Sequence, residues 1–134
     1  MVGTAVACGG SQPATTDTQP ALSAELSEVL DLADTVNVQT VATIKEREDV
    51  IVLDVREQWE YDEGHIPGVT LIPMAEVANR LSEIPTDKEV IVTCRSGNRS
   101  GQVTDFLRQQ GFDNVHNMEG GIIAWEAAGY AVEQ

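Results

Sequence analysis

After Thr35 the hydrophobic positions of the chain alternate between two kinds of run. Continuous apolar stretches occur at 50–55 (VIVLDV) and 89–93 (EVIVT), as is typical of strands that are buried on both faces of a parallel sheet. Between them, apolar residues recur at helical spacing, for example over 74–84. This alternation of strand and helix patterns predicts an α/β domain with a central parallel sheet.

The expected domain, residues 35–134, contains five short strands and the helices that connect them. The strands are expected at 36–38, 50–55, 70–72, 89–93 and 114–116. The helices are expected at 41–46, 74–84, 100–110 and 122–128. We therefore expect a five-stranded parallel sheet with helices on both of its faces.

The first 34 residues differ from the rest in composition. Residues 1–21 are rich in Gly, Ser, Thr, Pro and Gln and lack apolar periodicity, which predicts a disordered leader or tether. Residues 22–34 alternate apolar and acidic positions at helical spacing, which predicts an acidic amphipathic helix. That helix either covers part of the domain or docks a partner. No apolar run approaches the roughly 18 residues of a membrane span.

Acidic residues dominate the charge. The chain carries 22 Asp and Glu against 8 Lys and Arg, a formal net charge of −14. Because this field repels polyanions, the charge argues against nucleic acid and anionic membrane surfaces as partners. A single small domain with a polar surface also predicts a monomer.

The two cysteines, Cys8 and Cys94, lie in segments of unlike composition, so a disulfide explains neither of them. Ala5 to Cys8, followed by Gly-Gly-Ser, resembles the end of a bacterial lipoprotein signal. Cys8 is then either the lipidated residue of an extracytoplasmic protein or an inert cysteine in the leader of a cytoplasmic one. Two dispersed histidines and one loop cysteine do not supply a metal site.

Cys94 directly follows the predicted strand 89–93, at the sheet edge where ligands of open parallel sheets bind. The next six positions are small, polar or cationic: Arg95, Ser96, Gly97, Asn98, Arg99 and Ser100. Gly97 and Asn98 tolerate positive φ, so the amides can turn inward, and Ser100 is a favourable N-cap. These groups are expected to lower the pKa of the Cys94 thiol and create a nucleophile. The alternative is an inert buried cysteine.

Several blocks between residues 36 and 132 resemble the rhodanese (sulfurtransferase) domain family. They are 54–57 (DVRE), Tyr61 with 65–68 (HIPG), 94–99 (CRSGNR) and 119–122 (EGGI) with 124–125 (AW). The chain departs from the family's pattern at Val69, where alanine is usual. The resemblance implies the rhodanese-like fold.

By this resemblance, Cys94 takes a sulfane sulfur from thiosulfate or a persulfide donor and passes it to cyanide or a thiol through a persulfide. Arg95 and Arg99 are expected to bind the sulfonate oxygens of the donor, and the loop amides to cradle the persulfide. Ser96 and Asn98 are expected to assist. No metal or organic cofactor is implied.

Other members of the matching blocks are expected to be structural. Asp54 and Arg56 are predicted to form a hydrogen-bonded pair that holds loops near the site. His65 is predicted to stabilise a turn rather than to act as a general base. Trp59 and Trp125 are predicted to be packing residues.

Loop length separates two enzyme classes that share this fold. Dual-specificity phosphatases of the cell-cycle type have one more residue between cysteine and arginine than the sulfurtransferases. Four residues separate Cys94 from Arg99, which favours sulfur transfer. Two non-enzymatic alternatives stay open: a rhodanese-type binding or sensor module, and a sulfur carrier for a dedicated partner.

Overall fold

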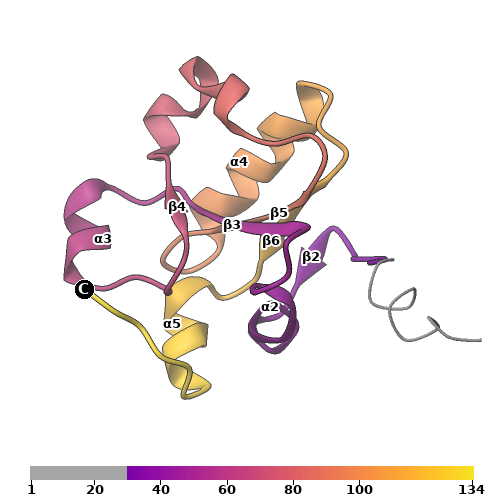
Figure 1. The fold of residues 1–134 in the computed structure, drawn as a ribbon. Coiled ribbons are helices and arrows are strands. Elements are labelled where there is room, and N and C mark those ends of the chain that lie inside the picture. The colour runs from indigo at the N-terminus through magenta and orange to yellow at the C-terminus, as the bar shows by residue number, and fades with distance from the viewer. Residues whose placement is uncertain (1–29) are drawn as a thin grey trace, which may run out of the picture. The chain divides into compact units, whose positions relative to one another are not determined.

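The computed structural model describes residues 30–134, and Leu32–Gln134 form one compact unit. Its centre is a parallel sheet with the strand order β2-β6-β5-β3-β4 (Figure 1). The strands are β2 (Thr35–Val36), β3 (Val50–Asp54), β4 (Thr70–Leu71), β5 (Glu89–Thr93) and β6 (Val115–Met118). Every neighbouring pair is parallel. The predicted five-stranded parallel sheet is confirmed.

Helices cover both faces of this sheet. They are α2 (Val38–Ile44), α3 (Gln58–Glu63), α4 (Asn98–Gln109) and α5 (Gly121–Ala127), with two 3₁₀ helices, η2 (Met74–Asn79) and η3 (Leu81–Glu83). The helix α4 packs against η2, and α2 packs against α5. Figure 1 shows these two pairs on opposite sides of the strands. The α/β class predicted from the alternating pattern is therefore confirmed.

The central strand β5 and its neighbour β3 contribute much of the core. The strand β3 pairs with β5 along its whole length, from Val50 opposite Glu89 to Asp54 opposite Thr93. The middle residues of both strands are buried, with Leu53 and Val92 both at 0% exposure. Burial on both faces explains why these strands are continuous apolar runs in the sequence.

The segment 74–84 differs from the single helix that its spacing predicts. It forms η2 and η3, with Arg80 between them at φ −128°, outside helical geometry. Its apolar positions are used as expected, because Val77 and Ile84 are buried. Two short 3₁₀ helices that bury these side chains therefore give the sequence the same apolar spacing as one continuous α-helix would.

The first strand and helix also differ from their predicted bounds. The strand β2 ends at Val36, and α2 begins at Val38 rather than at Val41. The reason is Asn37, whose Oδ1 accepts a hydrogen bond from the backbone amide of Thr40 at 2.8 Å. This N-cap starts the helix three residues earlier than the apolar spacing alone indicates.

Residues 30–34, the end of the predicted acidic helix, are not helical. The remainder of that helix, the predicted tether and Cys8 lie outside the described residues. Within residues 30–134 no helix combines the length and the apolar character needed to cross a membrane.

Candidate active site

Cys94 directly follows β5 at the carboxyl edge of the sheet. Its thiol is free, and the residue is 1% exposed. The Sγ atom accepts a hydrogen bond from the backbone N–H of Gly97 at 3.1 Å. Cys94 also belongs to the apolar core between the sheet and α4. The sulfur therefore lies between a packed core and a loop of polar backbone groups.

The start of α4 corrects one prediction. Its N-cap is Gly97, at φ 100°, and Ser100 lies inside the first turn with 0% exposure rather than at the cap. Gly97 has no side chain to accept hydrogen bonds from the first helical amides. The sulfur of Cys94 takes that place, because the amides of Gly97 and Ser100 both reach it.

The helix α5 holds the loop from the other side. The backbone N–H of Ile122 donates to the carbonyl of Cys94 at 2.9 Å, and that of Ile123 donates to the carbonyl of Arg95 at 3.1 Å. Because the carbonyls of Cys94 and Arg95 point toward α5, the amides later in the loop, those of Ser96 and Gly97, can point toward the sulfur. A Cβ at Gly121 would lie 2.3 Å from the carbonyl oxygen of Arg95, so this close approach requires glycine.

The surroundings of Cys94 favour its thiolate. Burial raises the pKa of the thiol, but hydrogen bonds from the Ser100 hydroxyl and from the amides of Ser100, Gly97 and Ser96 outweigh burial. The net effect is a pKa below the ordinary value of a cysteine. The sequence predicted a lowered pKa for the Cys94 thiol, and the structure gives the same direction. The groups that lower the pKa are hydrogen-bond donors of the loop rather than the arginines.

Arg99 lies in the first turn of α4 and is bound by Glu60 of α3. Its Nη1 and Nη2 donate to Oε1 and Oε2 of Glu60 at 2.8 and 2.9 Å. These hydrogen bonds are the main cause that lowers the pKa of Glu60 to about 2 and raises that of Arg99. Sequence reasoning missed Glu60. The one local signal is its position three residues after Glu57, whose amide it caps at 3.0 Å.

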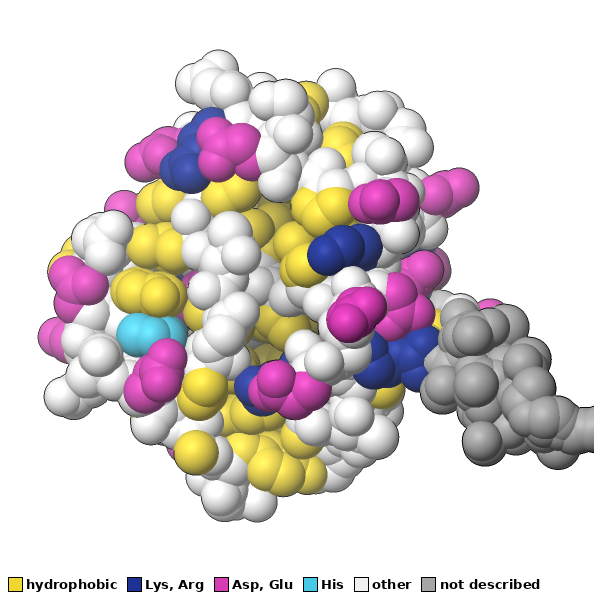
Figure 2. All heavy atoms as spheres, viewed as in Figure 1, with side chains coloured by type: hydrophobic (Ala, Val, Ile, Leu, Met, Phe, Trp, Pro, Cys, Tyr) yellow, Lys and Arg dark blue, Asp and Glu magenta, His cyan; other side chains and the backbone are white. Residues whose placement is uncertain are grey.

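Arg95 differs from Arg99 because it is exposed and, within residues 30–134, has no ion pair. All eight basic residues lie in the described part of the chain, and among them Lys88, which is half-buried, is the one other residue without an ion pair there. The other six are paired with carboxylates: Lys45, Arg47, Arg56, Arg80, Arg99 and Arg108. Figure 2 shows this pattern on one face, where basic side chains lie beside acidic ones. Arg95 is therefore a cation available to an anion near Cys94.

Asp54 and Arg56 form the predicted pair at the end of β3. Both are buried, and the guanidinium Nε and Nη2 donate to the carboxylate at 2.9 to 3.1 Å. Arg56 also donates to the carbonyl of Gly64 at 2.8 Å. The pair thus ties the end of β3 to the end of α3, the helix that carries Glu60.

His65 makes contacts that fit a structural role. Its ring stacks on Tyr61 with 3.7 Å between centroids, and Nδ1 lies 2.9 Å from the carbonyl of Tyr61. The other ring nitrogen lies 3.3 Å from Glu133. The two ring nitrogens therefore face acceptors in α3 and near the C-terminus, which supports the structural interpretation over a general base.

The two tryptophans have different environments. Trp125 is 2% exposed, and its indole N–H donates to the carbonyl of Ala131 at 2.8 Å, as expected of a packing residue. Trp59 is 62% exposed, so its prediction as a packing residue is wrong. Its position in α3 explains the difference, because the adjacent Glu60 turns inward to Arg99 while Trp59 faces solvent.

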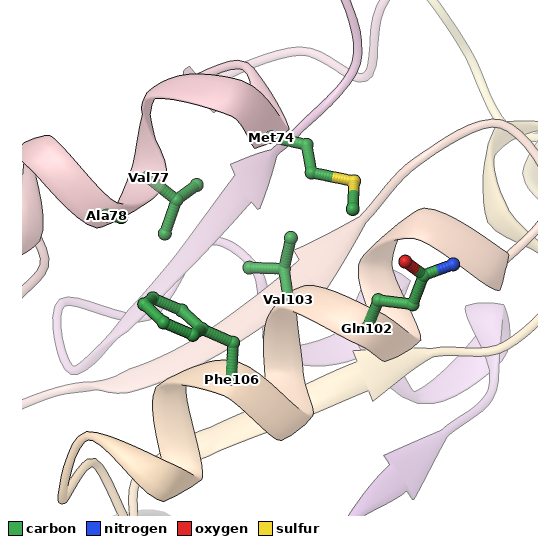
Figure 3. Close-up of a pocket in the computed structure, with 6 residues that line it drawn as sticks. All are labelled: Met74, Val77, Ala78, Gln102, Val103 and Phe106. Atoms are coloured by element: carbon green, nitrogen blue, oxygen red, sulfur yellow. The ribbon is translucent and has the colours of Figure 1, made fainter.

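A separate apolar pocket of about 300 Å³ lies between η2 and α4. Its lining consists of Met74, Val77, Ala78, Gln102, Val103 and Phe106. Figure 3 shows the apolar side chains gathered between the two elements, with Gln102 at one edge. None of these side chains is charged, so the pocket does not suit an anionic ligand. Within residues 30–134, no three His, Cys, Asp or Glu side chains cluster as metal ligands would.

A cysteine that directly follows the central strand of a parallel sheet, with its sulfur hydrogen-bonded by amides of the next loop, defines a class of α/β domain. The model of the rhodanese-like domain matches residues 37–128. The chain therefore belongs to the rhodanese-like family, as the sequence blocks indicated.

Similar proteins carry sulfurtransferase names. A sulfurtransferase of Allochromatium vinosum is 43% identical over 66% of this chain and 83% of its own length. The thiosulfate sulfurtransferase GlpE of Pseudoalteromonas translucida is 34% identical over 69% of this chain and 89% of its own. The crystal structure of a rhodanese-related protein from Thermoplasma volcanium superposes with a TM-score of 0.68 at 34% identity, covering 75% of this chain and 98% of its own.

Proposed function

We propose that this protein is a sulfurtransferase that carries a sulfane sulfur on Cys94. The observation that carries this proposal is the enclosure of Sγ by backbone amides, with Gly97 N at 3.1 Å, in a loop with four residues between Cys94 and Arg99. Such an enclosure stabilises a thiolate, and it offers the same donors to a persulfide.

The reaction has two displacements. The Cys94 thiolate attacks the outer sulfur of thiosulfate, the S–S bond of the donor breaks, and its electron pair leaves with sulfite. Cys94 then carries a persulfide. A cyanide ion or a thiolate attacks the outer sulfur of that persulfide, the new S–S bond breaks, and the Cys94 thiolate returns. No net oxidant or reductant is needed.

The two arginines have unequal roles in this proposal. Arg95 is exposed and unpaired within the described residues, so it can reach the sulfonate oxygens of an incoming donor. Arg99 donates from both terminal nitrogens to Glu60, so its positive charge is held in a fixed position near Cys94. The exposed side chains of Ser96 and Asn98 border the approach to the loop. The sulfonate contact is therefore assigned chiefly to Arg95.

The test is intact-mass analysis after incubation with thiosulfate. We expect the wild type to gain the mass of one sulfur atom on the peptide that contains Cys94, and to lose it on addition of cyanide or a thiol. Cys94→Ser, which is close in size, is the control and gains nothing. Absence of the adduct from the folded wild type, with thiosulfate and with a low-molecular-weight persulfide as donors, would refute the proposal.

The burial of Cys94 favours one second candidate, a sulfur carrier that exchanges sulfur with a dedicated partner. Because Cys94 is 1% exposed, its sulfur is poorly accessible to free acceptors. Steady-state kinetics separate the two functions. A transferase turns over repeatedly with thiosulfate and cyanide, whereas a carrier forms one adduct per chain and discharges it slowly. A binding module without chemistry forms no adduct.

A further inference from the structure

Two large apolar side chains are exposed in the described part of the chain, Trp59 at 62% and Ile123 at 47%. Both lie on elements that contact the candidate active-site loop. Trp59 directly precedes Glu60, the residue of α3 that binds Arg99. The amide of Ile123, in α5, donates to the loop carbonyl of Arg95 at 3.1 Å. Single exposed apolar side chains are ordinary on protein surfaces, but these two border one site.

The exposed face of α3 combines an aromatic ring with negative charge. Asp62 and Glu63 follow Trp59 by three and four positions, so the three side chains are neighbours on one face of the helix. All three are exposed, and neither carboxylate has an ion pair within residues 30–134. Asp62 accepts one hydrogen bond, from the side chain of Gln58 at 2.9 Å. The N-cap residue Glu57 is also exposed, and α3 contains no basic residue.

This face fits a cationic partner. Lys and Arg side chains bind over the face of an indole ring and also pair with carboxylates. The other border of the loop has the same sign, because Glu119 and Glu126 are exposed and 119–128 contains no basic residue. An acidic partner would be repelled by a chain of net charge −14. Tryptophan is also among the residues enriched at the energetic centres of interfaces, which favours a protein as the partner.

We propose that the exposed face of α3 docks a cationic protein segment whose cysteine accepts the sulfur from Cys94. This inference rests on the proposed function for the transfer step and names the acceptor. The acceptor thiolate attacks the outer sulfur of the Cys94 persulfide, the bond from that sulfur to Sγ breaks, and its electron pair returns to Sγ as the thiolate. The acceptor leaves as the persulfide. Docking beside the loop raises the local concentration of the acceptor thiol at a poorly accessible sulfur.

The probes are two labelled peptides that differ only in charge. Each has one cysteine, flanked by lysine and arginine in one peptide and by glutamate in the other. Fluorescence anisotropy measures the binding of each peptide, with serine in place of its cysteine, to the full chain carrying Cys8→Ser. Intact mass measures the rate at which each cysteine peptide discharges the Cys94 persulfide, corrected for its reactivity toward a small disulfide. Binding does not require sulfur transfer, so a missing thiosulfate adduct would refute the proposed function while the docking surface is still judged.

We expect the cationic peptide to bind more tightly than the anionic one, and Trp59→Ala to weaken its binding and slow its discharge rate about tenfold, as truncation of an interface tryptophan predicts. Discharge by cyanide should be unchanged, because cyanide needs no docking. Asp62→Asn with Glu63→Gln should weaken binding and reduce its salt dependence. The control is Asp87→Asn with Asp113→Asn, which removes two exposed carboxylates that precede β5 and β6 at the opposite edge of the sheet and should change nothing.

Equal binding of the two peptides to the wild type, or unchanged binding in Trp59→Ala, would overturn the docking surface. Discharge by the cationic peptide that is no faster than by the anionic one would overturn the acceptor role. Slower discharge by cyanide in Trp59→Ala would assign its effect to the loop rather than to docking. A dimer in analytical ultracentrifugation that Trp59→Ala dissociates would assign the face to a second copy of this chain.

Discussion

Glu60 and Arg99 are joined by two parallel hydrogen bonds of 2.8 and 2.9 Å, although they lie 39 positions apart. The pair connects α3 to the first turn of α4, and the carboxylate is largely buried. Because both terminal nitrogens of the guanidinium are engaged, its orientation beside Cys94 is set before any ligand arrives. The site therefore has one fixed arginine, Arg99, and a second arginine, Arg95, that has no ion pair within residues 30–134.

The Glu60 carboxylate should make stability depend on pH in acid. Its pKa falls from 4.5 to about 2, mainly through hydrogen bonds from Arg99, so the stabilisation is complete above pH 4.5 and is lost as pH falls toward 2. Glu60→Gln retains the helix cap but loses the charge. We expect it to reduce the free energy of unfolding near neutral pH by about 1–2 kcal/mol, less than the full shift implies because water partly screens the pair, and by little near pH 2. Chemical denaturation at both pH values measures this difference.

Glu83→Gln is the matched control for that prediction. Glu83 also pairs with an arginine, Arg80, but its side chain is 51% exposed, so water screens the pair. We expect a small change in stability at either pH. If Glu60→Gln lowered stability equally at both pH values, the ion pair would not be the source of the effect.

Replacement of Gly121 by alanine should separate the loop from α5. The new Cβ would meet the carbonyl oxygen of Arg95 at 2.3 Å, at a backbone φ of 59°. Gly129→Ala is the control, because Gly129 has φ 88° but nothing within 4 Å of an added Cβ. The control should lose about 1–2 kcal/mol from strain alone.

Gly121→Ala should lose more than this, and its Cys94 should alkylate more slowly at neutral pH because the loop amides no longer converge on the sulfur. Thermal unfolding and alkylation rates measure both effects. Equal losses of stability in the two variants, with unchanged Cys94 reactivity, would show that α5 does not hold the loop in this way.

Arg95→Ala should weaken the binding of an anionic donor. We expect the thiosulfate concentration at half-saturation to rise about tenfold, as loss of a charge-assisted hydrogen bond predicts, and to become less sensitive to salt. Lys88→Ala removes another cation without an ion pair among the described residues. It precedes β5, at the opposite end of the strand from Cys94, and should have no such effect. Equal effects of the two variants would indicate a general charge effect.

Local patterns were enough to predict the central part of the fold. The strand β5 has the predicted bounds, and β3 ends one residue earlier than predicted. Both strands are buried on two faces, so nearly every residue must be apolar and the pattern is unambiguous. The helix bounds were less accurate, because they depend on caps such as Asn37 and Gly97 rather than on the apolar period.

The amino-acid sequence by itself determined the α/β class, the loop after β5 and the cysteine within it, because each depends on the types and spacing of neighbouring residues. Only the tertiary structure decided which groups surround that cysteine. Glu60 on Arg99, Asn117 on Ser100 and the α5 amides on the loop carbonyls join segments far apart in the chain. Such contacts produce no pattern in the local sequence. They form because the carboxyl ends of parallel strands, which are distant in the chain, meet at one edge of the sheet.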